Sequence, residues 1–197
     1  QSLSLSKYDN HVRDQGLDLL SNPGFTGESG QAPVDLIRTL AVFAEAPSSE
    51  HIHLWQALGI EDSPSASEYA DIFLFQLYPY ASVHLGPEGM LGGEAQNRVA
   101  GFWRALGKNP PPEPDHLAAL LGLYATLSEQ VGPEQKVSNE LSGFSEAEAV
   151  LITQGRDALL QEHIAPWVPA YLERVIEIAS GPYRGWAVLL DKVLRVE

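Results

Sequence analysis

The sequence contains no cysteine and few basic residues, and both features exclude classes of function. Without cysteine among its 197 residues, the chain has no disulfide framework, no thiol nucleophile and no thiolate metal ligand. Lys and Arg number 12 against 26 Asp and Glu, which gives a formal charge of −14. Such a charge repels nucleic acid and anionic lipid. It serves ordinary solubility, and it also favours a basic partner such as a peptide that carries arginines.

Membrane-spanning and catalytic patterns are missing as well. No apolar run reaches the roughly 18 to 20 residues that cross a bilayer, and the first residues lack the basic and apolar regions of a secretory signal. We therefore expect a cytoplasmic protein without stable membrane insertion. His51 and His53 point to different faces of a helix, so no shared metal is expected. HExxH, EF-hand and GxSxG patterns are absent, which favours a binding protein without a cofactor over an enzyme.

Apolar residues recur at the three-and-four spacing of helices, and no strand-like alternation is found. The sequence predicts an all-α fold, a compact globular bundle of about eight to ten helices forming a single domain over residues 1–197. The polar stretch 128–144 is a candidate hinge, so monomer and domain-swapped dimer both remain open. The expected helices, bounded by proline, glycine and serine signals, are 3–20, 34–45, 48–58, 63–77, 94–106, 117–127, 145–163 and 167–179, with a last one after Gly181.

The expected helix 63–77 is apolar nearly all round, which predicts a central position. A long ordered loop, 78–93, is expected to follow it, with four glycines near its end. Such glycines can cradle phosphate, although this loop has neither the lysine and hydroxyl of a P-loop nor a preceding strand. Small-molecule or nucleotide binding at Gly86–Gly93 is therefore one alternative function, and a structural helical adaptor is another.

The stretch Pro110-Pro-Pro-Glu-Pro-Asp-His116 leads directly into a predicted helix that starts at Leu117. The prolines favour an extended approach, and Asp115 is well placed to cap the helix and to complement its dipole. One interpretation is a simple helix start with a histidine beside it. The other is that Asp115 and His116 lie at the rim of a groove and bind a ligand.

Three segments together resemble the TorD/DmsD/NarJ family of cytoplasmic chaperones for molybdenum-cofactor enzymes. The first is an aromatic helix that runs into Pro79-Tyr80-Ala-Ser-Val-His-Leu85, and the second is Glu113-Pro-Asp-His-Leu117. The third is Leu160-Gln-Glu-His-Ile-Ala-Pro-Trp-Val-Pro169. The three segments follow the order and spacing of the family over roughly residues 34–195. The chain departs from the family pattern in two places. The insert that many members have before Pro79 is almost absent, and position 80 is a tyrosine where tryptophan is commoner.

The resemblance implies an all-helical, non-catalytic chaperone. Its partner would be the catalytic subunit of a molybdopterin oxidoreductase, bound through a twin-arginine signal peptide or N-terminal segment while the cofactor is inserted and export is delayed. As a hypothesis, Asp115 binds a guanidinium, and the region of Tyr80 and Phe75 binds the apolar part. The peptide-binding residues implied by the resemblance are Phe75, Leu77, Pro79, Tyr80, Ser82, His84, Glu113, Pro114, Asp115 and His116.

Overall fold

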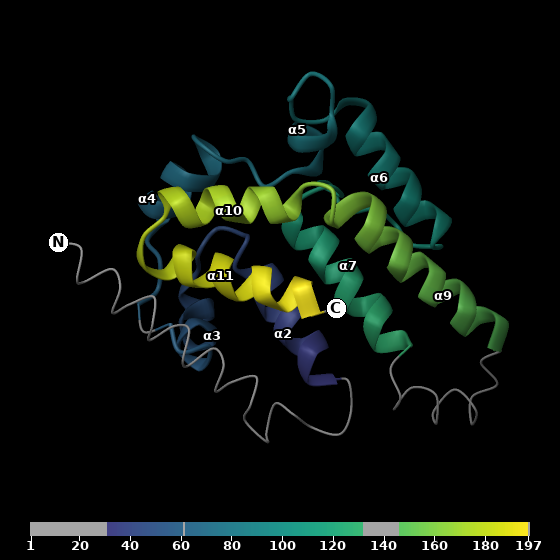
Figure 1. The fold of residues 1–197 in the computed structure, drawn as a ribbon, viewed down its shortest axis with the longest axis horizontal. Coiled ribbons are helices and arrows are strands. Elements are labelled where there is room, and N and C mark those ends of the chain that lie inside the picture. The colour runs from purple at the N-terminus through teal and green to yellow at the C-terminus, as the bar shows by residue number, and fades with distance from the viewer. Residues whose placement is uncertain (1–30, 61, 132–145, 197) are drawn as a thin grey trace.

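A computed structural model describes residues 31–60, 62–131 and 146–196. These residues form nine α-helices and no strand, which confirms the all-α prediction and its helix number (Figure 1). The helices are α2 (Gln31–Val42), α3 (Ile52–Ala57), α4 (Ala66–Tyr69), α5 (Ala81–Leu85), α6 (Gly93–Ala105), α7 (Leu117–Gln130), α9 (Glu146–Ala158), α10 (Val168–Ile178) and α11 (Gly181–Val196). The helix expected over 3–20 lies outside the described residues.

Helix α7 is the centre of the bundle. Its leucines at 117, 120, 121, 123 and 127 are at most 2% exposed, so this helix buries most of its circumference, as continuous apolar composition predicts. Helices α2 and α9 pack against it, and α10 and α11 form a neighbouring antiparallel pair (Figure 1). The stripe predicted on the second helix, 34–45, is buried from Leu36 to Ala44.

An aromatic cluster fixes α11 against α2 and extends toward α4. Phe43 stacks on Trp55 with ring centroids 3.7 Å apart, and Tyr183 meets Trp55 edge-on. The indole of Trp186 donates to the carbonyl of Leu40 at 2.9 Å, which satisfies a polar group that is otherwise buried. Tyr69 continues the cluster through Tyr183, so the core reaches the surface at α4.

The helix expected over 63–77 differs from its prediction. Ser65 and Glu68 form the capping box that starts it, but the α-helix gives way to a π-helical turn over Ala70–Leu74. This wider turn shifts the register of the side chains. Ile72 and Phe73 are buried, whereas Leu74 and Phe75 are 45% and 75% exposed. The expectation of a central helix was therefore wrong for its last turn.

The segments expected to be loops also contain helical structure. The stretch 78–93 includes the short helix α5, and α7 continues through Ser128 to Gln130, which shortens the candidate hinge. The rest of that hinge, 132–144, lies outside the described residues. A second π-helical turn, Leu159–Ile164, follows α9 and ends shortly before Pro166.

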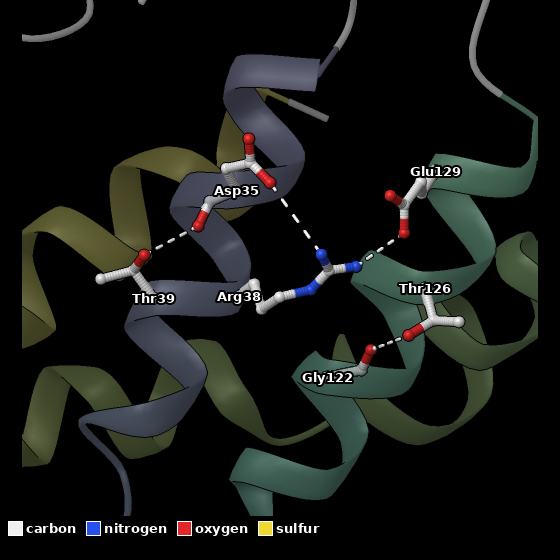
Figure 2. A network of polar contacts seen from close by, with 6 residues as sticks. All are labelled: Asp35, Arg38, Thr39, Gly122, Thr126 and Glu129. Carbon is white, nitrogen blue, oxygen red and sulfur yellow. Dashed lines mark hydrogen bonds and ion pairs between the residues drawn. The ribbon is translucent and has the colours of Figure 1, made fainter. Parts of the chain in front are cut away.

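Figure 2 shows a polar bridge between α2 and α7 in which Arg38 is held between Asp35 and Glu129. Its Nη2 donates to Glu129 at 2.8 Å, and both side chains are more than 40% exposed. Because water screens such pairs, we expect Arg38→Gln to lower the free energy of unfolding by less than about 1 kcal/mol. The buried Leu120→Ala should cost about 2–5 kcal/mol. Urea unfolding measures both, and an equal loss in the two variants would contradict this ranking.

Candidate functional site

Two segments that lie far apart in the sequence are joined at the start of α7. Tyr80 and His116 form an isolated antiparallel bridge. The amide of Ala81 donates to the carbonyl of Asp115 at 3.0 Å, and the amide of Leu117 donates to the carbonyl of Pro79 at 2.8 Å. The first two motifs that carry the family resemblance are therefore paired in space through their backbones.

Asp115 lies beneath this pairing and is fully buried. Its Oδ2 accepts the amide of Ser82, in the first turn of α5, at 3.0 Å. Ser82 is fully buried too, and its hydroxyl accepts the amide of Gly92 at 3.2 Å. Asp115 therefore stabilises the start of α5. The prediction that it caps the helix beginning at Leu117 was wrong, because the chain turns so that its side chain points across to the paired segment.

His116 provides the cap of α7 instead. Its Nδ1 accepts the amide of Ala118 at 3.2 Å, so a neutral ring carries its proton on Nε2. Burial lowers the pKa of His116, although the carboxylates of Glu113, Glu45 and Asp115 act in the opposite direction. The ring also meets Tyr80 edge-on, with centroids 4.8 Å apart. His116 is therefore uncharged, and its ring helps to hold Tyr80 in place.

A pocket of about 750 Å³ opens beside this histidine. Its floor is one face of α7, where small residues leave room, and its walls come from the end of α2, from α4, α6 and the proline-rich segment before α7. Thr126 donates its hydroxyl to the carbonyl of Gly122 at 2.8 Å (Figure 2). The lining residues are Glu45, Ala46, Tyr69, Tyr80, Trp103, Lys108, Pro111, Pro112, Glu113, His116, Ala118, Ala119, Gly122, Leu123 and Thr126.

Carboxylates and aromatic rings share the pocket. Burial raises the pKa of Tyr69, and the charges of Glu113 and Glu45 raise it further. Burial also raises the pKa of Tyr80, and its hydrogen bond to Glu113 adds to the effect. These causes place Glu113 near both phenols and Glu45 near Tyr69. The pocket therefore combines two carboxylates and the basic side chain of Lys108 with aromatic faces and an apolar floor.

The residues implied by the resemblance divide into three groups. Tyr80, Glu113 and His116 line the pocket. A second group is buried beneath it and supports its shape, namely Pro79, Ser82, Pro114 and Asp115. The third group lies outside the lining. Phe75 is largely exposed, and Leu77 packs against the core. The ring of His84 stacks on that of Trp167, with ring centroids 4.7 Å apart.

Sequence reasoning missed Glu45, Tyr69 and Trp103 as lining residues. Glu45 is the last residue of an expected amphipathic helix, where an exposed acid is ordinary, and Tyr69 reads as part of a core stripe. Trp103 is oriented by its indole, which donates to the carbonyl of Pro114 at 3.3 Å. Only the tertiary pairing of distant segments could have revealed these three.

The glycines of the expected phosphate loop have backbone roles. A Cβ at Gly86 would lie 2.5 Å from the carbonyl oxygen of Ser82, and Gly89, Gly92 and Gly93 have positive φ angles. Close approach and left-handed geometry both require glycine. None of these glycines lines the pocket described above.

Comparison with known proteins gives the family. The sequence profile of the nitrate reductase delta subunit family matches residues 43–173, which is more than half of the chain and includes the whole pocket lining. The chain belongs to this family, as the resemblance to the TorD/DmsD/NarJ chaperones predicted.

Two relatives of this chain, which belongs to the TorD/DmsD/NarJ family, are named chaperone protein TorD. They come from Vibrio vulnificus strains YJ016 and CMCP6, and are 30% and 29% identical to the chain over 135 residues. Each match covers 64% of this chain and 58% of the relative, so the chain spans less than two thirds of the length of these proteins. Within residues 31–60, 62–131 and 146–196, none of the helices has the length and apolar character needed to cross a membrane.

The buried position of Asp115 predicts a structural role that can be measured. Asp115→Ala leaves the amide of Ser82 without an acceptor, so we expect a loss of about 1–3 kcal/mol in the free energy of unfolding. Asp115→Asn keeps an oxygen at that position and should cost less. The exposed Glu113→Ala is the control, and we expect it to change stability by less than about 0.5 kcal/mol. Chemical denaturation measures the free energy of unfolding of the three variants. An equally small loss in Asp115→Ala and Glu113→Ala would contradict the structural role of Asp115.

His116 predicts a pH dependence of stability. Its folded pKa is lowered, so the unfolded chain binds the proton more readily, and stability falls as pH decreases through the unfolded value of about 6.5. His116→Asn keeps a capping residue that does not titrate and should reduce this slope. Part of the pH dependence should remain in this variant, because burial also lowers the pKa of His163. Melting temperatures of both proteins at several pH values test this, and equal slopes would exclude His116 as a cause.

Proposed function

We propose that this protein is a maturation chaperone for a molybdopterin oxidoreductase. In this proposal it binds the twin-arginine signal peptide, or a related N-terminal segment, of the catalytic subunit in the cytoplasm, assists cofactor insertion and delays export. Family membership supports the general role. The observation that carries the finer proposal is one pocket in which two carboxylates and two tyrosines adjoin an apolar helix face.

The chemistry of such a peptide matches the pocket. A twin-arginine segment has guanidinium groups followed by apolar residues. The carboxylates can form charge-assisted hydrogen bonds with the former, and burial of the latter contributes about 25 cal/mol per Å² of apolar surface. The overall charge of −14 attracts a basic segment over longer distances.

The volume of the pocket limits how much of the peptide it holds. Pockets of roughly 300–1,000 Å³ accommodate a drug-sized molecule, and 750 Å³ lies within this range. The pocket therefore binds a few residues around one arginine, and the remainder of the peptide extends beyond it. Affinity capture from the native host, with mass spectrometry, would identify the client. If repeated captures from cells that express a molybdopterin enzyme failed to recover it, the proposed function would be contradicted.

The floor of the pocket provides a direct test. A Cβ at Gly122 would meet no atom within 4 Å, so the position accepts a side chain, and we expect that of Gly122→Leu to extend into the pocket. Replacing a helical glycine also favours the helix, and we expect stability to be retained. Affinity for the client's N-terminal peptide, measured by isothermal titration calorimetry, should fall by about tenfold or more, since the apolar contact of a few residues is lost.

Gly101→Leu is the matched control for this variant. Gly101 is also a helical glycine with open space around its missing Cβ, but it lies on α6 outside the pocket lining. We expect it to bind the peptide like the unmodified protein. If Gly122→Leu bound equally well, the pocket would not be the peptide site.

A further inference from the structure

Glu45 reaches the pocket from a part of the chain that no shared motif includes. It follows the end of α2, whereas Glu113 precedes α7. Both carboxylates act on Tyr69 and on His116, so they approach the same corner of the pocket. Among the described residues, neither is paired with a basic side chain. Two acids from separate elements therefore line the pocket without an ion pair inside the described part of the chain, and Lys108 is the basic residue of the same lining.

His116 gives an independent indication of a ligand. The residue is only 7% exposed and lines the pocket, and its Nδ1 is occupied by the amide of Ala118. Nε2 has no hydrogen-bond partner in the described part of the chain, and it is not among the fully covered polar atoms. The neutral ring therefore has one N–H donor without a partner among the described residues, on a residue that lines the pocket. A donor beside two carboxylates fits a group that carries both a cation and a carbonyl oxygen.

We propose that Glu45 and Glu113 select arginine over lysine in the bound segment, while His116 Nε2–H donates to the backbone carbonyl of that arginine. This inference rests on the proposed peptide-binding function and assigns the residues that determine its specificity. It replaces the sequence-based hypothesis for the guanidinium partner, because Asp115 is fully buried and bonded to Ser82.

The preference for arginine follows from geometry. A guanidinium has five N–H donors in a plane and can bind two carboxylates at once, whereas an ammonium is a compact point charge. Its flat face can also lie against a tyrosine ring, and the pocket supplies Tyr69 and Tyr80. Glu113 lies close enough to the Tyr80 hydroxyl to raise its pKa, but a carboxylate has about four acceptor positions. It therefore retains capacity for a guanidinium.

The test measures fluorescence anisotropy with a labelled peptide of two adjacent arginines followed by leucines and alanines. A second peptide has lysines in place of both arginines. We expect the unmodified protein to bind the arginine peptide about tenfold more tightly than the lysine peptide. Glu45→Gln and Glu113→Gln should each weaken the arginine peptide by about tenfold and reduce the ratio between the two peptides.

Glu50→Gln is the matched control, because it removes the same charge from an exposed position outside the pocket. It should leave the ratio unchanged. The carbonyl contact is tested by competition, in which N-acetyl-arginine methylamide should displace the peptide better than methylguanidinium does. Equal potency of the two competitors would exclude that contact.

The outcomes separate this inference from the proposed function. If the arginine and lysine peptides bind equally and Glu45→Gln has no effect, while Gly122→Leu still weakens binding, the arginine selectivity is wrong and the peptide site stands. If the unmodified protein binds neither peptide nor the client's own N-terminal segment, both proposals fail. Retained melting temperatures in the Gln variants confirm that any loss is not unfolding.

Discussion

A buried carboxylate holds the two halves of the site together. Asp115 accepts the amide of Ser82, and backbone bonds on either side join Pro79 to Leu117 and Ala81 to Asp115. A buried carboxylate is costly unless hydrogen bonds compensate it. The amide of Ser82 compensates Oδ2, whereas Oδ1 is buried without a hydrogen-bond partner among the described residues, so the arrangement depends on both segments being in place. The direction of α5, the cap of α7 and the orientation of Tyr80 all depend on it.

This constraint separates supporting residues from those that can contact a ligand. Within the Glu113–His116 segment, Pro114 and Asp115 face inward, whereas Glu113 and His116 line the pocket. A short motif of this kind contains a structural carboxylate and an accessible one only two residues apart. The type of residue does not distinguish them. Burial does, because a fully covered carboxylate cannot exchange its backbone partner for a guanidinium without opening the fold.

The sequence was sufficient for most of the helices and for the two local motifs that pair at the start of α7. Helical periodicity predicted α2, α6, α7 and α10, since their apolar faces are continuous. It failed over Ala70–Leu74, because a π-helical turn changes the register and exposes Phe75. It also gave no indication of Glu45 or Tyr69 in the site. Their role arises only when α2, α4 and the start of α7 converge, and periodicity within one helix contains no such information.

Helix α7 fills the core with one face and forms the pocket floor with another, and these two roles require large and small side chains respectively. Its leucines fill the core, while Ala118, Ala119 and Gly122 form the pocket floor. A glycine within a helix costs roughly 0.5–1 kcal/mol relative to alanine, and the space beside Gly122 would accept a larger residue. The chain therefore carries a destabilising residue where a stabilising one fits. Such a compromise is expected where an open surface is needed for binding rather than for packing.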